Sequence, residues 1–425
     1  MSDQEQALHG ASTRLAGADT VDPTLMPTQD GEAVPRFLPS PDFANWLAQT
    51  AGSLVLSTYQ SGRLIFLYVE DGQLQVLDRV VGTAMGLALS SRHLWVGTRE
   101  QVWKFANTGV ATVDGKLKDA VYMPRKGYFV GPCDTHDVLA DVRFGGETHE
   151  LAFISTAFSC IAALDERYNF RPLWKPDFVP MLVTADFCHL NGFAARDGAI
   201  AYATLCGRTV EPGGWRQNRN AGGMVWDLAA NEPVATGMGM PHSPRWYRDR
   251  LWVLNSAAGQ FGYVDGDRGG FVAVVDCPGF ARGLTFVGDY AVIGLSQLRA
   301  NSFGAGMALT DKLQQSQVKQ RCGLQIVDLR TGRNAHWLTI TGPVTELYDV
   351  AFNPGVRHPY SPGFREPALH QQRVHLPLDS RFPHPYSQGV QPLATKPQAR
   401  REGAISPSDA VDGAIATAGD GAPAS

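Results

Sequence analysis

The sequence lacks three features that would assign it to a familiar class of protein. No segment reaches the roughly 18 unbroken apolar residues that a membrane-spanning helix needs. The net charge is only −4, so there is no electrostatic footprint for nucleic acid or an anionic membrane. None of the six cysteines forms a CxxC pair, which predicts reduced thiols inside strands. These cysteines are Cys133, Cys160, Cys188, Cys206, Cys277 and Cys322. The sequence therefore predicts neither a nucleic-acid partner nor a membrane partner.

The two ends of the chain are poor in core-forming residues. The first 20 residues are polar and contain no apolar core, so they do not form a signal peptide. We therefore expect a cytoplasmic protein. Residues 1–36 have few aromatic side chains and are predicted to be a disordered arm. Residues 355–425 begin with Pro-rich, His-containing segments, and we expect them to be disordered or to lie on the surface.

What the sequence does contain, between residues 37 and 354, is the pattern of an all-β domain. Apolar residues make up 44% of the chain, and its 45 glycines and 27 prolines suit many short strands joined by turns. A unit of four strands recurs, in which the second strand is apolar and ends in small polar residues. The copies cover residues 85–125, 136–176, 189–238, 242–276 and 282–341. Internal repeats of this length indicate a repeat architecture.

A sixth copy is split between the two ends of the domain. It begins at Glu346 with the sequence ELYDVAF and then stops, while three unassigned strands occupy residues 53–59, 63–69 and 73–79. A ring of sheets that shares its last sheet between both ends of the chain leaves no open edge. The sequence therefore predicts a six-bladed β-propeller with four strands per blade, closed by its N-terminal strands. The alternative is a pair of β-sandwiches.

Equivalent positions at the starts of the first strands carry chemically useful side chains. His136, His189 and His242 lie 53 residues apart at each step. Because first strands line the central channel of a propeller, these histidines are expected to converge there. Three imidazoles with an open position suit a divalent metal such as Zn, Fe or Mn. A polar site without metal, or a structural role inherited by duplication of the repeat, are the alternatives.

Other polar residues near the starts of the first strands are expected to act together with the three histidines. Glu346 and Asp349 are predicted to move a proton, and Arg282 is predicted to fix a substrate carboxylate or phosphate. Two long excursions of the chain between strands cover residues 207–223 and 296–322. Long loops on a rigid scaffold usually determine specificity. The residues predicted to bind substrate are Arg245, Asn191, Tyr59, Trp215 and Arg208.

Several segments resemble a known bacterial family. The strings DFCHLNGFA, GMPHSPRWYRDRLWVLNS, PGFARGLTFVGDYAVIGLS and CGLQIVDLRTG look like those of conserved hypothetical proteins with a domain of unknown function, over about residues 37–354. This resemblance implies a propeller and supplies no activity. More distantly, the architecture resembles the zinc-dependent peptidyl-hydroxyglycine lyase, whose disulfides and secretion signal are lacking here. It also resembles the gluconolactonase and strictosidine-synthase-like group, which holds its metal through Glu, Asn and Asp rather than His. Likeness of fold alone is weak support for a function.

Two functions remain open from the sequence. The first is a metal-dependent hydrolase, lyase or oxidoreductase acting on a small polar or anionic substrate. The second is a module that binds a glycan or peptide without turnover, through Tyr59, Trp215, Trp246 and Tyr348. A scaffold protein that docks through the Pro-rich tail is a third possibility. The sequence does not indicate an oligomeric state.

Overall fold

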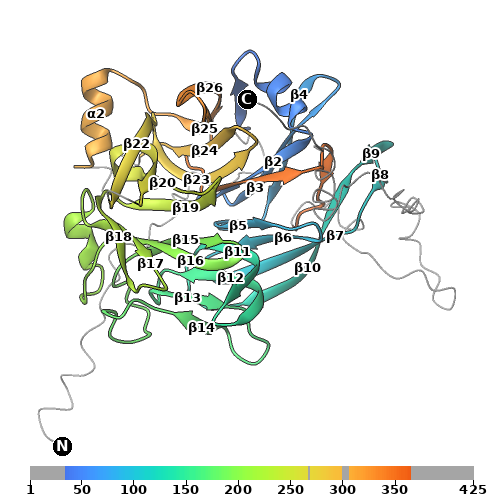
Figure 1. Ribbon diagram of the computed structural model, residues 1–425. Helices are drawn as coiled ribbons and strands as arrows, with labels where there is room; N and C mark the ends of the chain where they lie inside the picture. The colour runs from blue at the N-terminus through green and yellow to red at the C-terminus, as the bar shows by residue number, and fades with distance from the viewer. Residues whose placement is uncertain (1–33, 267–268, 299–305, 365–425) are drawn as a thin grey trace, which may run out of the picture. The chain divides into compact units, whose positions relative to one another are not determined.

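The computed structural model describes residues 34–266, 269–298 and 306–364, and within them the fold is all-β (Figure 1). Most of the predicted N-terminal arm and C-terminal tail lies outside these residues. In the described part of the chain, two short α-helices accompany the strands: α1 (Phe43–Gln49) and α2 (Ala308–Ser316). None of the helices in the described part of the chain is long and apolar enough to cross a membrane.

Most strands belong to antiparallel sheets made from consecutive segments of the chain. One sheet contains β5 (Leu87–Leu89), β6 (His93–Gly97), β7 (Gln101–Asn107) and β10 (Ala120–Phe129). The next contains β11 (Thr135–Phe144), β12 (Glu147–Ser155), β13 (Cys160–Ala163) and β14 (Arg171–Trp174). It is joined by one parallel pairing to a group with β15 (Leu190–Arg196), β16 (Ala199–Leu205), β17 (Gly223–Asp227) and β18 (Glu232–Met238).

Two further sheets follow in the second half of the chain. One contains β19 (Pro241–Tyr247), β20 (Arg250–Asn255), β21 (Gln260–Asp265) and β22 (Gly270–Asp276). The other contains β23 (Phe280–Val287), β24 (Tyr290–Ser296), β25 (Cys322–Asp328), β26 (Arg333–Thr341) and, at its edge, β1 (Arg36–Pro39). A small hairpin, β8 (Ala111–Val113) with β9 (Lys116–Lys118), branches off before β10.

The predicted pairing between the two ends of the domain is confirmed. β27 (Asp349–Pro354) pairs antiparallel with β2 (Gly52–Thr58), from Gly52 opposite Pro354 to Ser57 opposite Asp349. β3 (Arg63–Glu70) and β4 (Gln73–Val80) complete this sheet. In Figure 1 the orange C-terminal strand lies beside the blue β2 and β3. Residues nearly 300 positions apart in sequence thus share one ladder, which leaves no free edge at the junction.

The first strands of the sheets form a closed series of neighbours, which makes the fold propeller-like. β11, β15, β19, β23, β27 and β5 each contact the next, and β5 contacts β11 again. Glycines allow this close approach. A Cβ atom on Gly86 would lie 2.8 Å from the Cα of Asp137, and one on Gly283 would lie 2.7 Å from the Cα of Asp349. Both distances are shorter than atoms tolerate, so these two positions require glycine.

Hydroxyl groups at the ends of second strands join each sheet to the next. Ser57 Oγ donates to the carbonyl of Met85, Thr156 Oγ1 to that of Leu190, and Ser296 Oγ to that of Leu347. Each bond runs to the start of the first strand in the following sheet. The small polar residues that follow second strands in the sequence repeat therefore hold neighbouring sheets together.

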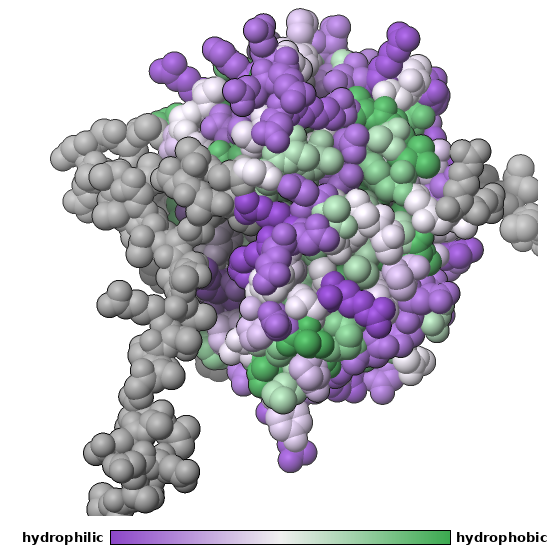
Figure 2. Space-filling model, turned by 90° about the vertical axis from the view of Figure 1, so that its left-hand side faces the viewer, coloured by the Kyte–Doolittle hydropathy of each residue, from purple (hydrophilic) through white to green (hydrophobic). Residues whose placement is uncertain are grey.

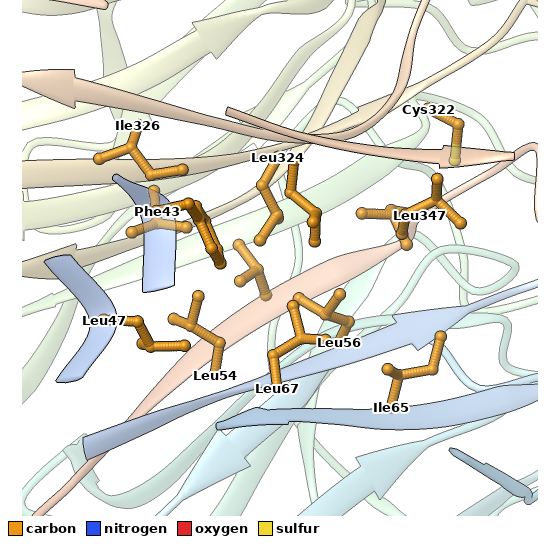
Figure 3. Packing of buried hydrophobic residues seen from close by; sticks show 14 of the residues in the cluster. Phe43, Leu47, Leu54, Leu56, Ile65, Leu67, Cys322, Leu324, Ile326 and Leu347 are labelled. Carbon is orange, nitrogen blue, oxygen red and sulfur yellow. The ribbon is translucent and has the colours of Figure 1, made fainter. Parts of the chain in front are cut away.

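Hydrophobic side chains fill the space between neighbouring sheets. Figure 3 shows one such cluster, in which Phe43 and Leu47 of α1 pack against side chains of β2, β3 and β25. The labelled members from those strands are Leu54, Leu56, Ile65, Leu67, Cys322, Leu324 and Ile326. Burying one such side chain contributes about 1.5–3 kcal/mol. On the face in Figure 2, hydrophilic residues predominate around smaller hydrophobic areas.

The packed chain continues past residue 354, where the sequence placed the start of the tail. β28 (Pro359–Tyr360) pairs parallel with β10. The ring of Phe364 lies 4.4 Å from that of Trp103, and Arg79 Nε donates to the carbonyl of Ser361. This segment crosses from β4 to β10 and so covers the junction between the last sheet and the first.

Candidate functional site

The three predicted histidines lie near one end of the ring of first strands: His136 and His242 line one cavity, and His189 lies beside His136. The rings of His136 and His189 are 5.0 Å apart, and Arg282 Nη2 lies 3.4 Å from His242 Nε2. In each ring Nδ1 donates to an oxygen: the carbonyl of Asp134 for His136, the carbonyl of Met240 for His242, and the carboxylate of Asp186 for His189. A carbonyl cannot donate, so Nε2 is the acceptor in the neutral rings of His136 and His242.

The turns that present these histidines use a strained backbone. Asp134, Asp186 and Met240 precede the three histidines and all adopt a positive φ, of 49°, 43° and 46°. His189 itself has a φ of 47°. Non-glycine residues with positive φ are uncommon and cluster at functional sites. Each of these turns brings an oxygen to the Nδ1 atom of the histidine that follows.

A small cavity lies among these side chains. It is lined by His136, Asp137, Asn191, His242, Ser243, Arg282, Tyr348 and Asp349. The volume of this cavity is about 10 Å³. That is close to the minimum that holds one water molecule. The cavity therefore accommodates one small polar group rather than a whole substrate.

Arg282 and Tyr348 provide the main polar groups of this cavity. The guanidinium lies 4.4 Å from the centre of the Tyr348 ring, and Arg282 Nη1 lies 3.5 Å from Glu346 Oε1. Arg282 Nε and Tyr348 Oη are both buried without a hydrogen-bond partner among the described residues. Burial raises the pKa of Tyr348 well above its usual value, so the phenol keeps its proton.

The histidines beside Arg282 are neutral at neutral pH. Burial, together with the positive charge of Arg282, holds the pKa of His136 well below its usual value. Burial and Arg282 do the same to the pKa of His242. Arg282 is therefore the cation of the cavity wall, while the imidazoles beside it offer lone pairs.

Two carboxylates that line the cavity, those of Asp137 and Asp349, lie within 4 Å of Arg245. Arg245, predicted to bind substrate, donates to both carboxylate oxygens of Asp137, at 2.8 and 3.0 Å, and lies 3.9 Å from Asp349. Asp349, predicted to move a proton, accepts from the backbone N–H groups of Leu87 and Val350. Burial raises the pKa of Asp349 to about 7, although Arg245 opposes this shift. Arg245 thus links β19 to β11 and β27, which are not its neighbours in the ring, and Asp349 links β27 to the segment of β5.

A pair that the sequence did not reveal stands at the mouth of the site. Asp186 accepts hydrogen bonds from both the backbone N–H and the Nδ1 of His189, at 2.9 and 3.0 Å. Trp215 Nε1 donates to the same carboxylate at 3.0 Å, and its ring stacks on His189 at 4.1 Å. The side chains of His189 and Asp186 remain 12% and 22% exposed, so the pair is open to solvent. In the sequence, the sign of this pair is that Asp186 precedes His189 by three residues.

The remaining predicted residues lie at varying distances from the cavity. Tyr59 accepts from Arg99 Nη2, and its ring lies 5.8 Å from that of Tyr348. Asn191 lines the cavity and accepts from Thr204 Oγ1. Arg208 is exposed and stacks over Phe178 and Trp226, away from the cavity-lining residues.

The two long excursions pack on one another beside the mouth. Asn220 Nδ2 donates to the carbonyl of Gly306, and the N–H of Ala308 donates to Asn220 Oδ1. Trp215, in a 3-10 helix (Gly214–Asn218), packs with Leu309 and Leu313 of α2 in one buried cluster. Trp215 is only 3% exposed, so it supports His189 and is not a platform for a glycan or peptide.

The three histidines are the predicted ligands of a divalent metal. The Nδ1 hydrogen bonds are those of metal-binding histidines, whose second nitrogen is usually held by an oxygen. However, among the residues that the structure describes, no group of three His, Cys, Asp or Glu side chains is placed to hold a metal ion. The guanidinium of Arg282 also lies against Nε2 of His242, the atom that would bind the metal. As arranged, these residues do not fit a three-histidine metal centre.

Comparison with solved structures found weak similarities. A nidogen/laminin complex is 11% identical, with a TM-score of 0.42, and the match covers 71% of this chain and 98% of that one. Selenomethionine-substituted virginiamycin B lyase from Staphylococcus aureus is 10% identical, with a TM-score of 0.34, covering 73% and 99%. Sqt1 of Saccharomyces cerevisiae is 13% identical, with a TM-score of 0.34, covering 67% and 70%. These similarities are too low to indicate a function. A search of curated proteins returned no match.

A family model accounts for most of the chain. It matches residues 41–361, from just before α1 to just after β28, and therefore includes every residue of the cavity and its mouth. The resemblance to a family without an assigned activity is thus confirmed. The chain belongs to the family described as Domain of unknown function (DUF4915).

Proposed function

We propose that this chain is a six-bladed propeller enzyme that transfers protons to or from a small polar or anionic substrate. The six first strands β5, β11, β15, β19, β23 and β27 would each begin one blade of four strands, with β27 completed by β2 to β4. The closed series of contacts among these strands supports that count. The chemistry would take place where their starts converge.

The observation that carries this proposal is the Asp186–His189 pair. A carboxylate bonded to Nδ1 fixes the tautomer, so that Nε2 is free to take a proton, and it stabilises the imidazolium that forms. The stacked indole of Trp215 prevents the ring from rotating. His189 is then a general base, and Asp186 is its positioning residue. Hydrolysis and elimination both need such a base.

The neighbouring groups suit a substrate that carries or develops negative charge. Arg282 supplies a fixed cation, and Tyr348 supplies a hydroxyl that keeps its proton. Both are held in place before a substrate arrives, which is what electrostatic stabilisation of a charged intermediate requires. The cavity is too small for a whole molecule, so the reacting atoms would lie at the mouth, next to His189.

The test is a reaction screen with matched variants. Purified protein would be assayed on panels of esters, lactones and hydroxy acids, by proton release for hydrolysis and by deuterium incorporation from solvent for C–H abstraction. We expect turnover that falls by about 10²-fold or more in His189→Gln. The His93→Gln variant, at a half-buried histidine of β6 outside the cavity lining, should retain full activity. Turnover unchanged by His189→Gln would rule out His189 as the base.

A divalent metal remains a second proposal, supported by the Nδ1 hydrogen bonds described above. It would require His242 to separate from Arg282. Elemental analysis by inductively coupled plasma mass spectrometry of wild type and of the His136→Ala, His189→Ala and His242→Ala variants tests this directly. Stoichiometric Zn, Fe or Mn that is lost in all three variants would support a metal centre. Its absence after reconstitution under reducing conditions would exclude one.

A cytoplasmic location is proposed from the cysteines. All six are free and buried. Burial raises the pKa of the Cys133 thiol to about 11 and that of Cys277 to about 12, so neither is reactive at neutral pH. Reduced, unpaired thiols are usual in the cytosol. Fractionation of the native host with an antibody against the chain would test this.

A further inference from the structure

We infer that the cavity is a carboxylate subsite, and that the substrate is a small hydroxycarboxylate whose carboxylate binds Arg282 and Tyr348. This inference rests on the proposed function and names the substrate class. Its strongest support is the pair of donors, Arg282 Nε and Tyr348 Oη, which are buried and have no hydrogen-bond partner in the described part of the chain. Leaving a buried donor unsatisfied is costly, because the group loses its hydrogen bonds to water and gains none in return. A ligand that accepts from both would recover that cost.

The geometry of the two donors suits a planar, two-oxygen group. Tyr348 is only 4% exposed, and its ring lies against the guanidinium, so the two donors belong to one rigid stack. Phe280 lies on the same guanidinium, 5.5 Å from its centre, and Glu346 holds Nη1. Arg282 is therefore fixed in orientation before a ligand binds, which reduces the entropic cost of binding.

The surrounding charges favour a carboxylate over a phosphate. Glu346 lies beside Arg282, and it would repel a dianion more strongly than a monoanion. Arg245 does not add to the positive charge, because Asp137 already pairs with it. The space for about one water molecule also suits one carboxylate oxygen pair better than a tetrahedral group.

The imidazole of His136 favours a ligand that carries a hydroxyl group. Its Nδ1 donates to Asp134, so its Nε2 is an acceptor and repels an anionic oxygen. His136 lines the same cavity as Arg282 and Tyr348. A hydroxyl next to the carboxylate would donate to this nitrogen. The adjacent carbon would then face the mouth, where the ring of His189 lies 5.0 Å from that of His136.

Calorimetric binding of four small probes tests the subsite without requiring turnover. The probes are glycolate, acetate, glycolamide and inorganic phosphate. We expect glycolate to bind, acetate to bind more weakly, and glycolamide and phosphate to bind at least tenfold more weakly than glycolate. No binding of glycolate, or tighter binding of phosphate, would overturn the inference.

Variants of single groups locate the probe. Tyr348→Phe removes only the hydroxyl and should weaken glycolate binding at least tenfold, while Arg282→Gln should abolish it. Arg143→Gln, on an exposed arginine bonded to the carbonyl of Asp197, should change nothing. Equal glycolate affinity in wild type and Tyr348→Phe, with both folded by circular dichroism, would contradict the assignment. His189→Gln separates the two proposals, because it should keep glycolate binding and lose turnover.

Discussion

At the scale of single residues, the site depends on which oxygen meets each imidazole. His136 and His242 donate to backbone carbonyls, whereas His189 donates to the carboxylate of Asp186. A carboxylate stabilises a protonated ring, and a carbonyl does so much less. Three histidines at equivalent positions in the repeat therefore differ in chemistry, and only His189 combines a charged partner with access to solvent.

Replacing Asp186 by Asn tests this difference. The amide keeps the size of the side chain but offers Nδ1 a donor as readily as an acceptor, so we expect His189 to shift toward the Nε2–H tautomer. Two-dimensional ¹⁵N–¹H correlation of the imidazole nitrogens reads the tautomer directly. Trp215→Phe is the control, since it removes a donor to the same carboxylate and should leave the tautomer unchanged. An unchanged spectrum in Asp186→Asn would argue against a positioning role.

Asp349 gives a prediction about the pH dependence of stability. Its pKa is raised to about 7 by burial, against about 3.9 in an unfolded chain. Between these values the native state holds a proton that the unfolded state has lost, so stability falls as pH rises. Relative to Asp349→Asn, the wild type should lose free energy of unfolding from about pH 4 to about pH 7 and change little above that range.

Urea unfolding of both proteins over that range is the measurement. Asp114→Asn, in the exposed turn between β8 and β9, is the control and should follow the wild type. The opposite slope, with the wild type gaining stability as pH rises, would mean that Asp349 is ionised and paired with Arg245 in the fold.

At the scale of elements, neighbouring first strands approach each other so closely that some positions leave no room for a side chain. Gly283 has a φ of +84° and faces the backbone of Asp349, whereas Gly72 has a φ of +73° and open space around it. Gly283→Ala should cost about 2–4 kcal/mol in free energy of unfolding, because strain and overlap add. Gly72→Ala should cost about 1 kcal/mol from strain alone. Equal losses in urea titrations would show that the close approach is not required.

The same elements show which parts of the site the sequence could predict. The three histidines were found because they occupy one phase of a visible repeat. Asp186 was not, because its role depends on two positive-φ residues that bring its carboxylate back to His189. The pairing of Arg245 with Asp137 joins residues 108 positions apart, on strands from different sheets. No local pattern reports such a contact. The sequence therefore predicts that Arg245 binds substrate and gives no sign of its internal ion pair with Asp137.

At the scale of the whole molecule, two separate closures hold the ring together. The first, β27 on β2, could be predicted because a repeat was visibly missing three strands at one end and had three spare at the other. The second, β28 on β10, could not, because two paired residues within a Pro-rich segment carry no strand pattern. Both lie where the two ends of the described domain meet, at which point the ring would otherwise open.

Truncation distinguishes the contributions of these closures. A chain ending at residue 364 keeps both, whereas one ending at residue 354 keeps β27 but loses β28, the hydrogen bond from Arg79 to Ser361, and the contact of Phe364 with Trp103. Removing a fully buried phenylalanine costs about 3–5 kcal/mol, and Phe364 is partly buried, so its loss should cost less than that. Together with the lost β28 pairing, it should make the shorter chain unfold at a lower urea concentration. Phe364→Ala in the longer chain isolates the aromatic contact. If the two truncations were equally stable, β27 and β2 alone would be enough to close the ring, and the segment after residue 354 would only lie along it.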